Sequence, residues 1–222
     1  MKVCTDACLF GALLPAKFHA FSEFRALDIG AGTGLLSLMY TQKNEHAIID
    51  AVEIDGNAAQ QAKENFDTAP WRERLSVIHS SIQDFSNNQQ RKYALIFSNP
   101  PFFEDDLKSK NEQRNLALHS TSLHLRELFI IAKKLLNTQG VFAVLLPYHR
   151  TEQALQLGKE NRLHLQQKIL VKQTLKHNYF RSILVFSECI CAESLSEICI
   201  KDETDHYSKV FTALLKDFYL KL

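Results

Sequence analysis

Short apolar runs alternate along the chain with stretches in which apolar residues recur at helical spacing. The runs have the length of buried strands, and the stretches between them have the period of amphipathic helices. Strands that alternate with helices are typical of a mostly parallel sheet covered on both faces. We therefore predict an α/β, Rossmann-like fold. Its seven strands are expected at residues 25–29, 47–54, 75–79, 93–98, 141–146, 165–174 and 182–188.

Two helices have the clearest signals. One is expected at 122–136, with an apolar stripe and with Gly140 shortly after its end. The other is expected at 56–69, where Pro70 stops it. The link between the last two strands is too short for a parallel crossover, so we expect them to pair antiparallel. Beyond them we expect a strand near 197–201 and a final helix at 207–222 whose apolar side chains dock on the core.

Length and composition fit one domain in the cytoplasm. The chain has 222 residues, of which 45% are hydrophobic. We expect a single domain over residues 1–222, with a cofactor-binding half at about 1–92 and a substrate-facing half at about 93–222. The longest apolar run, 141–146, is far shorter than the roughly 20 residues of a membrane helix. The first residues of the chain do not have the pattern of a secretion signal, so we expect a cytoplasmic protein without a membrane partner.

Cysteine spacing and charge limit the remaining classes. The five cysteines form neither an even disulfide set nor a zinc-ligand pattern, so we expect reduced thiols and no metal; in Cys189 and Cys191 the spacing resembles a strand. The net charge of +1 argues against binding of nucleic acid through overall charge. Positive residues nevertheless gather between positions 159 and 181, where only Glu160 opposes them. This basic segment is either an RNA-binding surface or a solvated face.

A glycine loop follows the first predicted strand. It reads Asp28-Ile29-Gly30-Ala31-Gly32-Thr33-Gly34, whereas a dinucleotide fingerprint would require glycine in place of Leu35. Glycines let a ligand approach the backbone closely. The Asp28 carboxylate would repel a pyrophosphate but suits a cofactor that carries an ammonium and a sulfonium, as S-adenosylmethionine does. We therefore predict that Asp28, Gly30, Gly32 and Gly34 bind S-adenosylmethionine.

Two further acids are placed to bind the same cofactor. Glu53 ends the second predicted strand, where an acid can accept hydrogen bonds from ribose hydroxyls. Asp84 follows the third strand, where we expect it near the adenine amino group. Asp55 is more simply explained as the cap of the helix that begins at Gly56.

The turn Asn99-Pro100-Pro101-Phe102 ends the fourth predicted strand. The Asn99 side chain and the Pro100 carbonyl offer two hydrogen-bond acceptors, and the prolines stiffen the turn that holds them. Two fixed acceptors fit a planar NH2 group, and Phe102 offers a flat face on which a base or an amide can stack. An ordinary strand exit is the alternative. Together with the glycine loop, the turn predicts methyl transfer to an amino group.

With these motifs in this order, the chain resembles the class I S-adenosylmethionine-dependent methyltransferases, and more narrowly the tRNA1(Val) (adenine(37)-N6)-methyltransferase family. The narrower resemblance covers essentially the whole chain and rests on segments 1–12, 69–71, 98–103 and 216–220. It implies N6-methylation of an adenosine beside the anticodon of a transfer RNA, with Asn99, Pro100 and Phe102 at the reacting amine. It also implies that Thr5 lies close to the cofactor, although a helix cap is the alternative.

Other features leave alternatives open. Arg114 and His119 either contact RNA or belong to a solvated loop. Family members carry a leader before the segment that matches residues 1–12, so we expect weak activity without it if the leader helps to close the site. The substrate could instead be a glutamine amide of a protein or a guanine amino group of ribosomal RNA. A non-catalytic RNA-binding module is a further alternative, because a fold does not fix a function.

Overall fold

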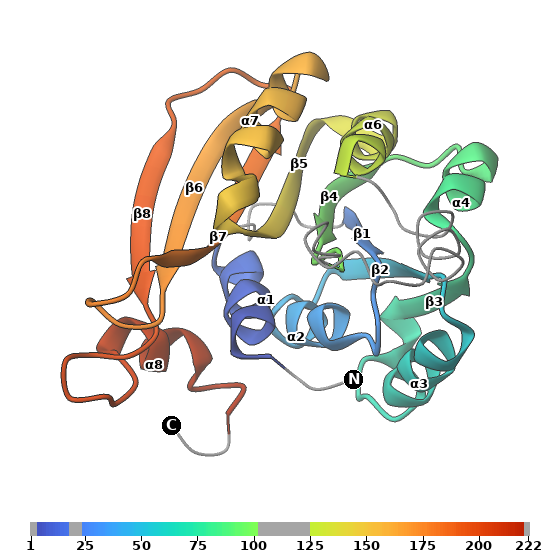
Figure 1. Ribbon diagram of the computed structural model, residues 1–222. Helices are drawn as coiled ribbons and strands as arrows, with labels where there is room; N and C mark the ends of the chain where they lie inside the picture. Colours follow the sequence, from blue (N-terminus) through green and yellow to red (C-terminus); the bar gives the residue numbers. More distant parts are fainter. Residues whose placement is uncertain (1–3, 18–23, 102–124, 220–222) are drawn as a thin grey trace, which may run out of the picture.

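The computed structural model describes residues 4–17, 24–101 and 125–219. Its centre is an eight-stranded sheet with the strand order β3-β2-β1-β4-β5-β7-β6-β8 (Figure 1). The strands are β1 (Phe24–Ile29), β2 (Ala47–Glu53), β3 (Leu75–His79), β4 (Tyr93–Ser98), β5 (Leu136–Pro147), β6 (His164–Lys172), β7 (Tyr179–Ser187) and β8 (Ser194–Cys199).

Helices cover both faces of this sheet (Figure 1). One apolar cluster joins the sheet to α1, α2 and α8, and a second joins it to α4, α6 and α7. The α-helices among the described residues are α1 (Thr5–Lys17), α2 (Leu35–Lys43), α3 (Gly56–Asp67), α4 (Ile82–Asn88), α6 (Leu125–Leu135), α7 (Thr151–Glu160) and α8 (Lys209–Leu215), and two short 3-10 helices are η1 (Arg72–Arg74) and η2 (Tyr148–Arg150).

The predicted Rossmann-like class is confirmed. Strands β1 to β5 pair in parallel, and β7 runs antiparallel between β5 and β6, as the short link between the last two predicted strands indicated. The sheet has eight strands rather than seven, because β8 adds a parallel edge strand beside β6. Four of the six residues of β8 are exposed. Its apolar pattern is therefore weak, and the sequence predicted this strand at 197–201 instead.

Two other sequence expectations need correction. Strand β5 begins at Leu136, directly after α6, although its first apolar run starts at Val141. Thr138 and Gln139 between them are polar and exposed, which hid this part of the strand. Cys189 and Cys191 lie in the connection after β7 and not in a strand, and both are free thiols.

The register brings four strand ends to one edge of the sheet, which we call the carboxyl edge. Ile29 of β1 lies beside Val52 of β2 on one side and Ser98 of β4 on the other, and Ser98 in turn lies beside Val144 of β5. In open α/β sheets, ligands bind outside such an edge. Within the part of the chain that is described, no helix is both long and apolar enough to cross a membrane.

Candidate active site

The glycine loop bends sharply between β1 and α2. Gly30, Gly32 and Gly34 all have left-handed backbone angles, with φ of 72°, 58° and 81°. Such angles are strained for residues that carry a Cβ atom. A Cβ at Gly34 would lie 2.3 Å from the ring of Phe66, whereas a Cβ at Gly30 would meet nothing within 4 Å. Gly34 is therefore needed for packing against α3, and Gly30 borders space that a ligand can use.

Asp28 is a buried carboxylate with an unsatisfied oxygen. Its side chain is fully buried at the end of β1, and Oδ2 accepts a 2.7 Å hydrogen bond from the Ser37 hydroxyl on α2. Its Oδ1 is buried and has no hydrogen-bond partner among the described residues. Burial, and secondarily the nearby Glu53 carboxylate, raises the pKa of Asp28 to about 7. An orphaned oxygen of this kind calls for a cationic or hydrogen-donating ligand.

Glu53 connects the glycine loop to the end of β2. One carboxylate oxygen accepts a 2.7 Å hydrogen bond from the Gly32 amide, and the other accepts a 2.9 Å hydrogen bond from the Asp55 amide. Each oxygen has a second lone pair, so the carboxylate can also accept bonds from two ribose hydroxyls. The cap expected at Asp55 is confirmed, because its side chain accepts a 2.8 Å hydrogen bond from the Ala58 amide.

Asp84 has a structural partner of its own. It lies exposed in the first turn of α4, where its amide donates to the Ser81 hydroxyl at 3.0 Å and the same hydroxyl donates to Asp84 Oδ2 at 2.7 Å. This reciprocal arrangement caps the helix. One oxygen is thus engaged in the cap, and the adenine contact of Asp84 stays a prediction.

The sequence reasoning missed Ile54 and Ser37. Ile54 follows Glu53 and leaves 51% of its surface exposed, which offers an apolar face beside the acid that is predicted to bind the ribose. An apolar residue placed directly after the acid at a strand end was the available signal. Ser37 gave no comparable signal, because its bond to Asp28 arises only once α2 packs on the sheet.

The proline turn is held next to the glycine loop. Ser98, fully buried at the end of β4, donates a 2.8 Å hydrogen bond to the carbonyl of Ile29, which directly precedes Gly30. Asn99 follows half-buried, Pro100 is buried and Pro101 is exposed. The amide of Asn99 therefore lies at the point where the two motifs meet.

The roles of four other predicted residues stay predictions. Thr5 is the first residue of α1, and its described side-chain contact is with Tyr219 in the C-terminal tail rather than with the glycine loop. Its cofactor contact stays a prediction. Phe102, Arg114 and His119 lie outside the described residues.

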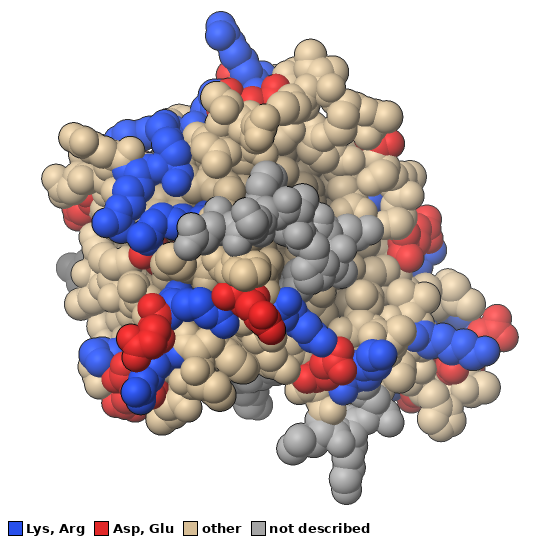
Figure 2. All heavy atoms as spheres, turned by 180° about the vertical axis from the view of Figure 1, so that it is seen from behind, with Lys and Arg blue, Asp and Glu red and all other residues tan. Residues whose placement is uncertain are grey.

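The basic segment is not a single uncompensated patch. Lys172 pairs with Glu197 at 3.3 Å, and Arg181 pairs with Asp6 at 2.7 Å. Glu160, the one acid within the segment, binds Arg126 instead. The sequence did not show these ion pairs, because the partners come from distant parts of the chain. Figure 2 shows one face of the molecule, on which positive side chains gather at the upper left and both signs alternate along the lower part.

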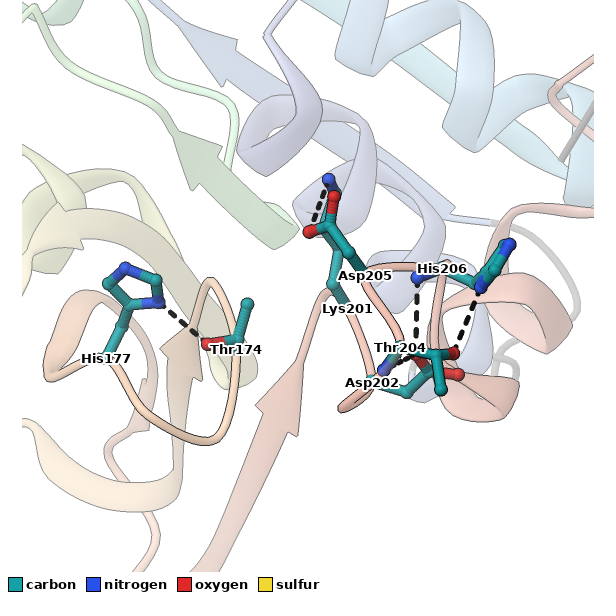
Figure 3. Close-up of polar contacts among 7 residues, drawn as sticks. All are labelled: Thr174, His177, Lys201, Asp202, Thr204, Asp205 and His206. Carbon is teal, nitrogen blue, oxygen red and sulfur yellow. Dashed lines mark hydrogen bonds and ion pairs between the residues drawn. The ribbon is translucent and has the colours of Figure 1, made fainter.

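Two polar loops at the carboxyl edge bond within themselves (Figure 3). In the loop between β6 and β7, the Thr174 hydroxyl lies 2.7 Å from His177 Nδ1. After β8, Asp202 Oδ1 accepts hydrogen bonds from the amide and the hydroxyl of Thr204, and these bonds lower the pKa of Asp202. Lys201 pairs with Asp205 at 2.9 Å. Within residues 4–17, 24–101 and 125–219, no three His, Cys, Asp or Glu side chains gather as a group that could hold a metal ion.

Comparisons with known proteins agree with this geometry. The family model "methyltransferase small domain" matches residues 9–153. Among solved structures, a predicted O-methyltransferase from Agrobacterium tumefaciens aligns with a TM-score of 0.72 at 14% identity, over 95% of each chain. A ribosomal protein L11 methylase from Lactobacillus delbrueckii subsp. bulgaricus aligns with a TM-score of 0.56 at 16% identity, over 80% of this chain and 76% of that one. These likenesses establish the fold.

Curated relatives give the family. A tRNA1(Val) (adenine(37)-N6)-methyltransferase from Flavobacterium johnsoniae is 38% identical over all of this chain and 94% of its own length. Relatives of the same name from Dyadobacter fermentans and from Pectobacterium carotovorum subsp. carotovorum are 40% and 38% identical, over 100% and 99% of this chain and 91% and 88% of their own lengths. These matches confirm the resemblance found in the sequence: the chain belongs to the tRNA1(Val) (adenine(37)-N6)-methyltransferase family.

Proposed function

We propose that this chain transfers a methyl group from S-adenosylmethionine to the N6 amino group of adenosine 37, beside the anticodon of tRNA1(Val). The observation that carries the proposal is the position of Asn99. Asn99 is half-buried and directly follows Ser98, whose hydrogen bond to the Ile29 carbonyl joins the proline turn to the glycine loop. The names of the relatives, which align over nearly their whole length, supply the substrate.

The residues present fit the cofactor. The unpaired Oδ1 of Asp28 can bind a cationic ligand. The negative charge of the same carboxylate attracts a cation and repels a pyrophosphate. Gly30 leaves room for close approach, Glu53 can bind the ribose, and Ile54 can pack on the adenine. When bound, S-adenosylmethionine supplies a methyl group that its sulfonium makes electrophilic.

The proline turn would orient the amine. Asn99 Oδ1 and the Pro100 carbonyl each accept one amino hydrogen of the adenine, which directs the nitrogen lone pair away from the ring. Pro100 has no N–H that could compete as a donor. Orientation of two bound reactants can contribute roughly 7 to 11 kcal/mol to catalysis, so no side chain with a tuned pKa is required. Because the target is a base, it must leave its stack to reach the turn, which RNA loops permit.

Transfer of label decides between the candidate substrates. The chain is incubated with radioactive S-adenosylmethionine and, separately, with total transfer RNA, ribosomal RNA or protein extract. We expect label in transfer RNA only, and in a tRNA1(Val) transcript but not in the same transcript with guanosine at position 37. Label in a protein glutamine or in ribosomal RNA guanine would contradict the proposal and favour the corresponding alternative.

A further inference from the structure

Two tyrosines lie in contact at the carboxyl edge, outside the site described so far. Tyr148 is the first residue of η2, directly after β5, and Tyr179 is the first residue of β7. Their ring centroids are 5.2 Å apart and the ring planes are tilted by 45°. Tyr148 keeps 41% of its surface exposed, whereas Tyr179 is half-buried. We call these residues the tyrosine pair.

The sheet register places the tyrosine pair beside the proline turn. Ser98, the last residue of β4, lies level with Val144 of β5, and β5 continues to Pro147. Pro147 pairs with Arg181 of β7 on its other side, and Tyr148 follows Pro147 at once. Because β4 and β5 are neighbouring parallel strands, the proline turn and Tyr148 leave the sheet at the same edge (Figure 1).

Several contacts fix the pair in place. The backbone carbonyl of Tyr148 accepts a 2.6 Å hydrogen bond from the Thr151 hydroxyl, and that hydroxyl also lies 2.9 Å from Ser182 of β7. Lys172 Nζ lies 4.4 Å above the ring of Tyr179, whose hydroxyl donates to Glu197. Tyr179 therefore supports its neighbour from the side and leaves the ring of Tyr148 as the more accessible one. A rigid, exposed aromatic ring is a suitable platform for a base.

Charge at this edge favours stacking over purely ionic attraction. Lys172 pairs with Glu197, Arg181 with Asp6 and Lys201 with Asp205, which leaves little net charge from these residues. The chain as a whole carries only +1. These paired cations contribute little through phosphate attraction, so part of the affinity for a flexible RNA loop must come from contacts with bases.

We propose that Tyr148 stacks on a nucleotide next to the target adenosine and so holds the anticodon loop while the adenosine enters the site; this inference rests on the function proposed above. Tyr179 positions Tyr148 and does not itself contact the RNA. The occupant is one unpaired base on either the 5′ or the 3′ side of the target. Stacking tolerates any base, so specificity for its identity is not expected here.

Steady-state methylation of a tRNA1(Val) transcript tests this role. With cofactor saturating, Tyr148→Ala should raise KM for the transcript about tenfold, since that is the lower range of one lost base–aromatic stack. Tyr148→Phe keeps the ring and should stay within about twofold of the wild type. Cofactor affinity by calorimetry should be unchanged in both. Tyr207→Ala, at an exposed tyrosine beyond β8, is the matched control and should not change KM.

Transcripts with an abasic nucleotide on either side of the target identify the stacked base. For the wild type, KM should rise about tenfold on one of the two abasic transcripts. For Tyr148→Ala, KM on that transcript should be no higher than its KM on the intact transcript. Additive losses, or an unchanged KM in Tyr148→Ala, would overturn the inference while leaving the proposed function intact. An equal loss in Tyr207→Ala would also overturn it. If the wild type fails to methylate even the intact transcript, the proposed function fails, and this inference with it.

Discussion

The proposed cofactor side and the proposed substrate side of the carboxyl edge are assembled from contacts of different range. On the cofactor side, Asp28, the glycines and Glu53 lie within one β-α-β unit, where Gly32 donates a 2.7 Å hydrogen bond to Glu53 and Ser37 donates a 2.7 Å hydrogen bond to Asp28. On the substrate side, ion pairs join residues from opposite ends of the chain, as Asp6 and Arg181 do at 2.7 Å. The comparison indicates that cofactor binding and substrate binding can be perturbed separately.

The largest difference between the effect on turnover and the effect on cofactor affinity is expected for a substitution of Asn99. Asn99→Ala removes one acceptor from the reacting amine and should lower turnover by about a hundredfold or more, by analogy with the loss of one preorganised polar group. Cofactor affinity by calorimetry should stay near the wild-type value, because the glycine loop is untouched. Asn57→Ala, at an exposed position on α3, is the control. Near-normal turnover of Asn99→Ala would contradict a catalytic role for the turn.

Asp28 should give the opposite result, a loss confined to the cofactor side. Asp28→Asn keeps an acceptor for the Ser37 hydroxyl but removes the charge, so cofactor affinity should fall about tenfold or more. In the cofactor-free protein at pH 8, the same variant should be more stable by roughly 1 to 3 kcal/mol, because an ionised buried carboxylate is no longer required. Calorimetry and thermal unfolding measure the two effects. Lower stability of the variant would contradict this account.

The raised pKa of Asp28 also sets a pH dependence. Since the folded-state pKa, about 7, lies above the ordinary value of 3.8, Asp28 binds its proton more tightly in the folded chain. Its contribution to stability is therefore largest at low pH and is lost as pH rises toward 7. A cationic cofactor needs the ionised form, so its affinity should rise between pH 6 and 8. Calorimetry in buffers of different ionisation enthalpy should show proton release on binding at pH 6.5, and Asp28→Asn should abolish it.

A smaller effect is expected at Glu53. Glu53→Ala should weaken cofactor binding by about 1 to 3 kcal/mol through the loss of charged hydrogen bonds to the ribose. Asp55→Ala is a matched control two residues away. It removes the cap of α3 and should cost about 1 kcal/mol of stability without changing cofactor affinity. Equal affinities in the two variants would show that Glu53 only supports the glycine loop.

The same difference in contact range explains how far the sequence could be interpreted. The glycine loop, Glu53 and the strands around them could be predicted, because spacing along the chain determines them. The bounds of strand β8, the start of β5 and the partners of Lys172 and Arg181 could not, because they depend on exposed residues or on contacts across the sequence. The cap role of Ser81 and Asp84 shows a further limit, since a carboxylate after a strand has the same sequence signal whether it binds a ligand or a backbone amide.

The smallest expected effect concerns the basic segment. Lys176 lies at the carboxyl edge, in the loop between β6 and β7, exposed and without an ion pair among the described residues. Lys168 lies within β6, away from that edge, and Lys172 is paired with Glu197. Each phosphate contact changes the logarithmic salt dependence of RNA affinity by about 0.7 to 0.9. Lys176→Ala should therefore flatten the salt slope by about one unit, and the triple variant Lys168→Ala, Lys172→Ala, Lys176→Ala should do little more.

Affinities for the tRNA1(Val) transcript at several salt concentrations measure this slope, with Lys159→Ala as the control. A decrease of about two units in the triple variant would show that Lys172 exchanges Glu197 for phosphate when RNA binds, and an unchanged slope would place the phosphate contacts elsewhere.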